Sequence, residues 1–133
     1  ILNAENGNEG PLEALAEGQV VLHWHSDKFE IPEGATWLKK SDACNNQAFW
    51  WDERVLGIQF HLETDESCLN NLLDSGGALE HSASNWVQSE EDLESGISFL
   101  PDLKEAYFKV LDRLFLTEKK LIYNYRPRNH SAC

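Results

Sequence analysis

The chain has 133 residues, enough for one domain with a hydrophobic core, and its apolar fraction of 41% predicts a globular rather than a disordered protein. Its 23 acidic and 11 basic residues give a net charge of −12, which argues against binding to nucleic-acid backbones or anionic membrane surfaces. No apolar run reaches the roughly 18 residues of a membrane-spanning helix, so none is predicted.

The start of the chain has no clear hydrophobic period, and residues 1–10 are predicted to form a loop. The first residue is Ile1 rather than Met, and no signal-peptide pattern follows it, which suggests a piece of a longer protein. The three cysteines are an odd number without metal-ligand spacing. They predict free thiols in a reducing compartment, and we therefore expect a cytoplasmic protein.

Four short segments between residues 20 and 61 have the composition of β-strands and are separated by turn residues. The predicted strands are 20–25, 35–40, 47–51 and 55–61. Because the connections are short, we expect a local antiparallel or mixed sheet that includes the strands near 20–27, 47–51 and 55–61.

After Glu63 the hydrophobic period changes to that of a helix. Thr64 is the predicted N-cap of the next helix, which should end at the glycines of 76–77. Its apolar stripe consists of Leu69, Leu72 and Leu73. A short helix is predicted to start at Ser89, within an acidic segment.

A longer amphipathic helix is predicted over residues 102–116, with Asp102 and Glu105 as a capping-box-like start. Its apolar residues recur at helical spacing, which predicts one face in the core. These residues are Leu103, Ala106, Tyr107, Val110, Leu111, Leu114 and Phe115. The basic and aromatic tail, 121–133, receives no functional assignment.

The strongest functional signal is the pair His61 and Glu63 at the end of the fourth predicted strand. Residues two apart on a strand point to the same face, so the carboxylate can hold one imidazole nitrogen and leave the other free to accept a proton. This is the base and orienting acid of a catalytic triad. An ordinary pair at a strand end is the alternative interpretation. No cysteine or serine lies in a Gly-x-nucleophile-x-Gly elbow, so the nucleophile is missing.

Three motifs in this order resemble the class I glutamine amidotransferases, and most closely the branch related to the amidotransferase domain of GMP synthase. The motifs span 21–35, 46–49 and 57–63, and the resemblance covers about residues 11 to 75. It implies an α/β fold in which residues 1–133 are one domain fragment. This fragment would be the C-terminal part of a three-layer, flavodoxin-like domain with a mixed sheet and flanking helices.

The resemblance also implies an activity, in which a Cys-His-Glu triad hydrolyses glutamine and releases ammonia for transfer to an acceptor. His61 and Glu63 match the family's histidine and glutamate, while its cysteine belongs to an N-terminal half that this chain does not contain. That half is the implied partner, glutamine the implied substrate, and no cofactor or metal is implied. The chain departs from the family at Leu62, where Pro is usual, and at Ser26, where Gly is usual. By itself the chain is predicted to be inactive.

Three further residues are candidates for supporting the site. His25 and Asp27 are expected to position a loop near it, and Gln47 is expected to brace a turn rather than to bind substrate. His23, on the same strand face as His25, is expected to be a hydrogen-bonded histidine at a sheet end.

Several alternatives remain open at this point. The chain could be part of an active amidotransferase or part of a γ-glutamyl hydrolase or peptidase of that fold. A third alternative is a non-catalytic module of the same fold with a binding or regulatory role. A metal site built from His23, His25, Glu30 and His61 loosely resembles the cupin arrangement, although the spacing differs. The sequence leaves the oligomeric state open, including a homodimer.

Overall fold

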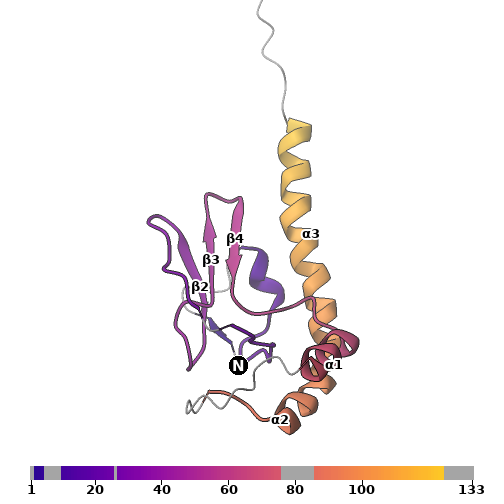
Figure 1. Cartoon of the computed structure of the whole chain (residues 1–133). Coiled ribbons are helices and arrows are strands. Elements are labelled where there is room, and N and C mark those ends of the chain that lie inside the picture. The colour runs from indigo at the N-terminus through magenta and orange to yellow at the C-terminus, as the bar shows by residue number, and fades with distance from the viewer. Residues whose placement is uncertain (1, 5–9, 26, 76–85, 125–133) are drawn as a thin grey trace, which may run out of the picture.

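The computed structural model describes the backbone of residues 2–4, 10–25, 27–75 and 86–124, and the side chains of these residues as far as residue 115. The elements in chain order are β1 (Asn3–Ala4), the 3-10 helix η1 (Pro11–Ala14), β2 (Thr36–Lys40), β3 (Ala48–Trp51), β4 (Val55–Ile58), α1 (Glu66–Asp74), α2 (Glu90–Ser95), the 3-10 helix η2 (Gly96–Phe99) and α3 (Leu100–Asn124). Figure 1 shows α3 standing beside the sheet, with η1 between β4 and α3.

The sheet has four strands in the order β1-β2-β3-β4, and every pair among the described residues is antiparallel. The β3–β4 hairpin places Phe49 opposite Gly57. A side chain at Gly57 would collide with the ring of Phe49, so only glycine fits at this position. The ring of Phe49 in turn packs edge-on against Phe29, with centroids 5.1 Å apart.

Three of the four predicted strands are confirmed, with shorter bounds than expected. The predicted strand 20–25 is wrong. Instead of a ladder, this segment forms an isolated bridge between Leu22 and His61, in which the His61 N–H donates to the Leu22 carbonyl at 2.9 Å. Val21 is buried, so the apolar run packs into the core without joining a ladder. The predicted loop at the start is also partly wrong, because β1 pairs with β2 and Leu2 is fully buried.

The first two helices agree with the sequence except at one cap. Asp65, not Thr64, is the N-cap of α1, and its carboxylate accepts a hydrogen bond from the Cys68 N–H at 2.8 Å. Thr64 is buried instead. The predicted start of α2 is confirmed, because Ser89 and Asp92 form a complete capping box. The expected end of α1 at 76–77 lies outside the described residues.

Helix α3 begins earlier than predicted because it continues directly from η2. Asp102 therefore lies in the first turn rather than at the cap, and Pro101 is tolerated because N–H groups there have no intrahelical acceptor. Leu103, Ala106 and Val110 are buried, which confirms the core face. Phe115 was expected on that face but is 61% exposed. At about 100° per residue it lies roughly 120° around the helix from Leu103, beyond the edge of the buried stripe.

The core lies where the inner face of the sheet, η1 and α3 meet. Its buried members include Leu12, Leu15, Leu38, Ala48, Leu103, Ala106 and Val110. The ion pair between Glu13 and Arg113, 2.6 Å long, also joins η1 to α3. The predicted α/β class is confirmed. None of the helices in the described ranges is long and apolar enough to cross a membrane.

Candidate active site

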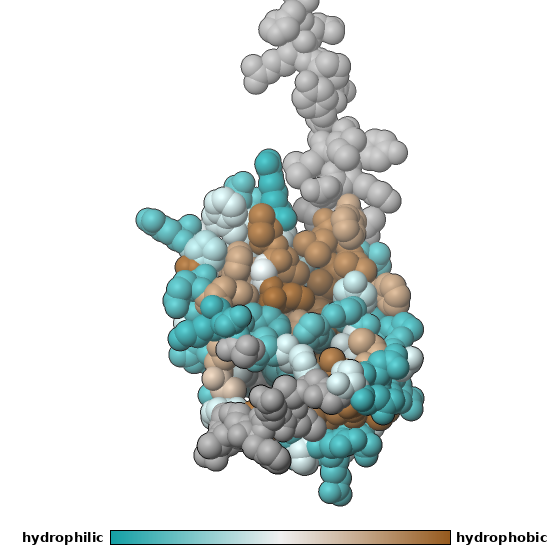
Figure 2. Space-filling model, viewed as in Figure 1, coloured by the Kyte–Doolittle hydropathy of each residue, from teal (hydrophilic) through white to brown (hydrophobic). Residues whose placement is uncertain are grey.

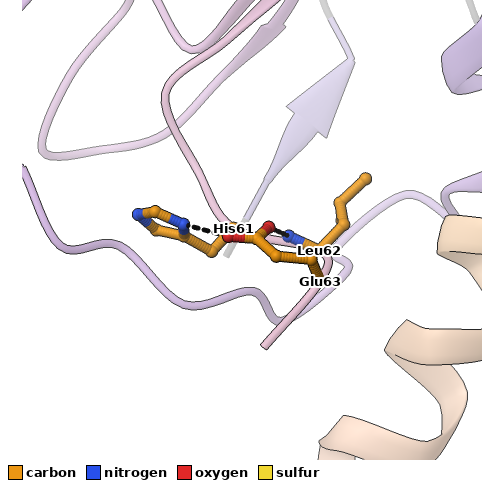
Figure 3. Close-up of polar contacts among 3 residues, drawn as sticks. All are labelled: His61, Leu62 and Glu63. Carbon is orange, nitrogen blue, oxygen red and sulfur yellow. Dashed lines mark hydrogen bonds and ion pairs between the residues drawn. The ribbon is translucent and has the colours of Figure 1, made fainter. Parts of the chain in front are cut away.

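His61 and Glu63 lie side by side just after β4. The His61 Nδ1 and the Glu63 Oε1 are 2.7 Å apart, and the Glu63 Oε2 accepts a hydrogen bond from the Leu62 N–H at 3.0 Å (Figure 3). The predicted His–carboxylate contact is therefore confirmed. Both carboxylate oxygens are engaged, which fixes the orientation of the carboxylate relative to the ring.

The local backbone explains why these two side chains face outward together. Beyond β4 the residues alternate: Phe60, Leu62 and Thr64 are buried, and the histidine and glutamate between them face the other way. The side chains of His61 and Glu63 are 38% and 54% exposed. The apolar residues thus anchor the segment in the core, and the bond from the His61 N–H to the Leu22 carbonyl holds the backbone on the other side.

The electrostatics of the pair favour an ionised glutamate. Desolvation alone would raise the pKa of Glu63, but hydrogen bonds from the His61 ring and from the backbone N–H groups of Leu62 and Glu63 outweigh it, so its pKa lies below the usual value. A carboxylate can only accept, so the Nδ1 of His61 carries the proton in this contact. The Nε2 is then the basic nitrogen, and it points away from the carboxylate (Figure 3).

His25 and Asp27 lie on the segment that passes His61, and both are exposed. The His25 Nδ1–H donates to the backbone carbonyl of Asp27 at 2.9 Å. Asp27 therefore orients the His25 ring through its main chain. This contact is local, and the supporting role expected for both residues stays a prediction.

His23 differs from the expectation of a hydrogen-bonded histidine. Its two ring nitrogens are buried and have no hydrogen-bond partner. The ring packs edge-on against Phe60 and His25, with centroids 6.4 Å and 5.8 Å away. Burial, together with nearby positive charge that includes His25 and His61, lowers the pKa of His23 to about 4. A neutral imidazole therefore lies behind the site, at the wall of an apolar cavity of about 150 Å³.

Gln47 is buried, and its Nε2 donates to the Ser41 Oγ at 3.0 Å. Its backbone N–H donates to the Lys39 carbonyl, next to the irregularity between β2 and β3. These bonds suit the bracing role that was predicted for it. Sequence reasoning missed Gln59, whose Nε2 donates to the Asn46 carbonyl at 2.5 Å and so ties this loop to the segment before His61. Gln59 is part of the motif at 57–63, but its spacing from other polar residues does not indicate this contact.

The two described cysteines are free thiols. Cys44 Sγ lies 4.0 Å from both the Asn46 carbonyl and the Gln59 Nε2, and Cys68 is exposed in the first turn of α1. Cys133 lies outside the described residues. Within the described part of the chain, no group of three or more His, Cys, Asp or Glu side chains could hold a metal ion.

Comparisons with known proteins agree with this fold. No family model and no curated sequence matches the chain. The solved structures similar to it include a glutamine amidotransferase from Methylobacillus flagellatus (TM-score 0.73, 23% identity, covering 99% of this chain and 53% of that one). A second is a protein described as SMU.1228c (TM-score 0.72, 23% identity, covering 86% of this chain and 50% of that one). A third is a glutamine amidotransferase from Thermotoga maritima (TM-score 0.65, 21% identity, covering 85% of this chain and 47% of that one).

These similarities are structural. At identities of 21% to 23% they show that the chain has a fold of the class I glutamine amidotransferase kind. The chain spans about half the length of these solved structures.

Proposed function

We propose that this chain is the C-terminal half of a glutamine amidotransferase and supplies two members of a Cys-His-Glu triad. One observation carries the proposal: the 2.7 Å contact between His61 Nδ1 and Glu63 Oε1, which leaves Nε2 free on an exposed face. A cysteine nucleophile from the N-terminal half, absent from this chain, would complete the site. The substrate is glutamine, and the product ammonia passes to an acceptor.

The chemistry follows from the roles of these groups. The Nε2 of His61 takes the proton of the cysteine thiol, and the thiolate attacks the side-chain amide carbon of glutamine. The imidazolium then protonates the departing nitrogen, which leaves as ammonia, and a glutamyl thioester remains. Water attacks the thioester while His61 removes its proton, and glutamate is released. Glu63 stabilises the imidazolium during both formation and hydrolysis of the thioester, and it keeps the proton on the Nδ1 of His61.

The supporting residues act on the surroundings of the triad. His25, oriented by the Asp27 carbonyl, borders the site on the segment bridged to His61. Gln47 bonds to Ser41 and so holds the loop between β2 and β3. Gln59 bonds to the Asn46 carbonyl of this loop, which in turn holds the backbone that precedes His61. We place the protein in the cytoplasm, because that compartment keeps thiols reduced, the proposed nucleophile is a thiol and the described cysteines are unpaired.

The test is ammonia release from glutamine by the full natural chain, meaning the product of the whole coding sequence that contains these residues. We expect activity that is lost in His61→Ala. A full chain with no cysteine in an elbow, and no glutaminase activity, would make the fold a binding or regulatory module. Cleavage of γ-glutamyl peptides in preference to glutamine would instead assign a hydrolase or peptidase that uses the same pair.

A further inference from the structure

The carboxylate of Glu63 is held at both of its oxygens, by two partners of different kinds (Figure 3). Oε1 lies 2.7 Å from the Nδ1 of His61, and Oε2 accepts a hydrogen bond from the Leu62 N–H at 3.0 Å. The first partner is a side chain that is 38% exposed and has rotatable bonds of its own. The second partner belongs to the main chain, so its position depends on how firmly the backbone is held.

Leu62 is anchored in the core. Its side chain is 1% exposed, and the side chains of Phe60 and Thr64, two residues to either side, are also buried. The residue before it is held as well, because the His61 N–H donates to the Leu22 carbonyl at 2.9 Å. The N–H of Leu62 therefore has a position that the core sets, independently of the conformation of the Glu63 side chain.

A donor fixed in this way matters because the pair itself is exposed. A contact between two exposed, flexible side chains contributes little, since water competes for it and both side chains lose rotational freedom. Glu63 has several rotatable side-chain bonds and is 54% exposed. The Leu62 N–H restrains its carboxylate before the ring of His61 binds, so less freedom remains to be lost. The bond is also of the stronger kind, because its acceptor is ionised.

We infer that Leu62 is a positioning residue, whose main-chain N–H presents the Glu63 carboxylate to His61 in the orientation that proton transfer at Nε2 requires. The inference rests on the proposed function and adds to it a group that acts through Glu63. Proline, which is usual at this position in the family that the chain resembles, has no N–H and cannot take this role. The second anchor of the carboxylate therefore depends on the leucine that this chain has instead.

The charge of Glu63 agrees with this role. Desolvation raises the pKa of its carboxyl, but hydrogen bonds from the His61 ring and from the N–H groups of Glu63 and Leu62 bring the pKa below its usual value. Loss of the Leu62 bond should therefore raise this pKa. The ionisable groups near the pair include His25 and His23, on the segment that is bridged to His61. They are the same in all variants compared below.

Replacement of one peptide N–H by an ester oxygen tests the inference in the full natural chain. The α-hydroxy analogue of leucine, incorporated at position 62, keeps the buried side chain and removes the donor. The matched control is the same replacement at Leu69, which is 3% exposed and whose N–H donates to the Asp65 carbonyl at 3.0 Å. Both variants lose one backbone hydrogen bond at a buried leucine, but the bond to Glu63 is lost only in the first.

We expect the ester at position 62 to lower kcat for ammonia release about 2- to 10-fold, the factor that corresponds to one hydrogen bond. The KM for glutamine should stay within about twofold, because the lost interaction acts on the chemical step. The Glu63 carboxyl, followed by carbon NMR, should titrate at a higher pH than in the wild type. The ester at position 69 should change neither kcat nor this titration.

Equal kcat values in the two ester variants, or an unchanged titration of Glu63 in the first, would overturn the inference. A full natural chain that releases no ammonia would refute the proposed function, and the titration would then decide by itself whether the Leu62 N–H holds the carboxylate. Ammonia release together with an unchanged titration would do the reverse. It would support the proposed function and remove Leu62 from it.

Discussion

At the scale of single residues, the proposed triad ranks three side chains by their distance from the reacting proton. His61→Ala in the full natural chain should lower turnover by about 10²- to 10⁴-fold, the range of general acid–base groups. Glu63→Gln should cost less, because the amide keeps a hydrogen bond but loses the charge that holds the Nδ1 proton. His25→Ala should cost least, because its ring bonds to a backbone carbonyl.

Ammonia release from glutamine measures this order, and circular dichroism confirms that each variant is folded. A folded His61→Ala protein with nearly unchanged turnover would end the proposed mechanism. A loss in His25→Ala as large as that in His61→Ala would instead give His25 a direct part in proton transfer.

The buried ring of His23 predicts a dependence of stability on pH. The pKa of His23 falls from about 6.5 to about 4 on folding, so the folded state resists its protonation. Its contribution to stability is complete above pH 6.5 and is lost as the pH falls towards 4. His23→Leu should therefore lose less stability than the wild type between pH 7 and 4.5.

Urea midpoints at the two pH values measure this loss, and His25→Leu controls for removing a histidine from the same segment. The ionisable groups near His23 include the N-terminal amine, His25, His61 and, at the cavity, Asp92. An equal decrease in the wild type and in His23→Leu would assign the acid sensitivity to groups other than His23.

At the scale of elements, the β3–β4 hairpin depends on one glycine. In Gly57→Ala the added methyl group would collide with the Phe49 ring, which is itself packed against Phe29. We expect a loss of about 1–3 kcal/mol in the free energy of unfolding, as for other overpacked sites. Phe49→Leu in the same chain should recover part of it. Two losses that simply add in the double variant would show that the clash is not the cause.

The cap of α1 gives a second test at this scale. Asp65→Ala removes the acceptor of the Cys68 N–H and should cost about 0.5–2 kcal/mol in the free energy of unfolding. Asp65→Asn, which keeps an oxygen acceptor, should cost much less. Chemical denaturation measures both variants. Equal losses would mean that the charge of Asp65, rather than its bond to the backbone, stabilises the helix.

Sequence patterns predicted the hairpin strands, α2 and the buried stripe of α3, because alternation, capping residues and helical spacing are local. They failed for residues 20–25, where a run of apolar residues is buried by packing rather than by strand pairing. The His61–Glu63 contact was predictable because two residues fix it. The burial of the His23 ring without a hydrogen bond was not predictable, because it depends on packing against Phe60, which lies 37 positions away in the chain.

At the scale of the whole molecule, the described residues of the chain hold an acid–base pair and expose large apolar side chains, Ile58 of β4 among them. Figure 2 shows a brown, apolar area on one face of the molecule, bordered by hydrophilic residues. Under the proposed function, the nucleophile comes from the other half of the domain. By itself the 133-residue chain should therefore release no ammonia from glutamine. It should also associate with increasing concentration, because exposed strand edges and apolar patches pair with further copies.

Sedimentation of the 133-residue chain measures that association. Ile58→Lys places a charge on β4, at the end of the described sheet, and should return the chain towards a monomer, whereas Val87→Lys should not. Ammonia release by the short chain that is abolished by alkylating Cys44 or Cys68 would contradict the division of the triad between two halves. A 133-residue chain that stays monomeric at all concentrations would show that the exposed apolar residues of β4 do not drive association.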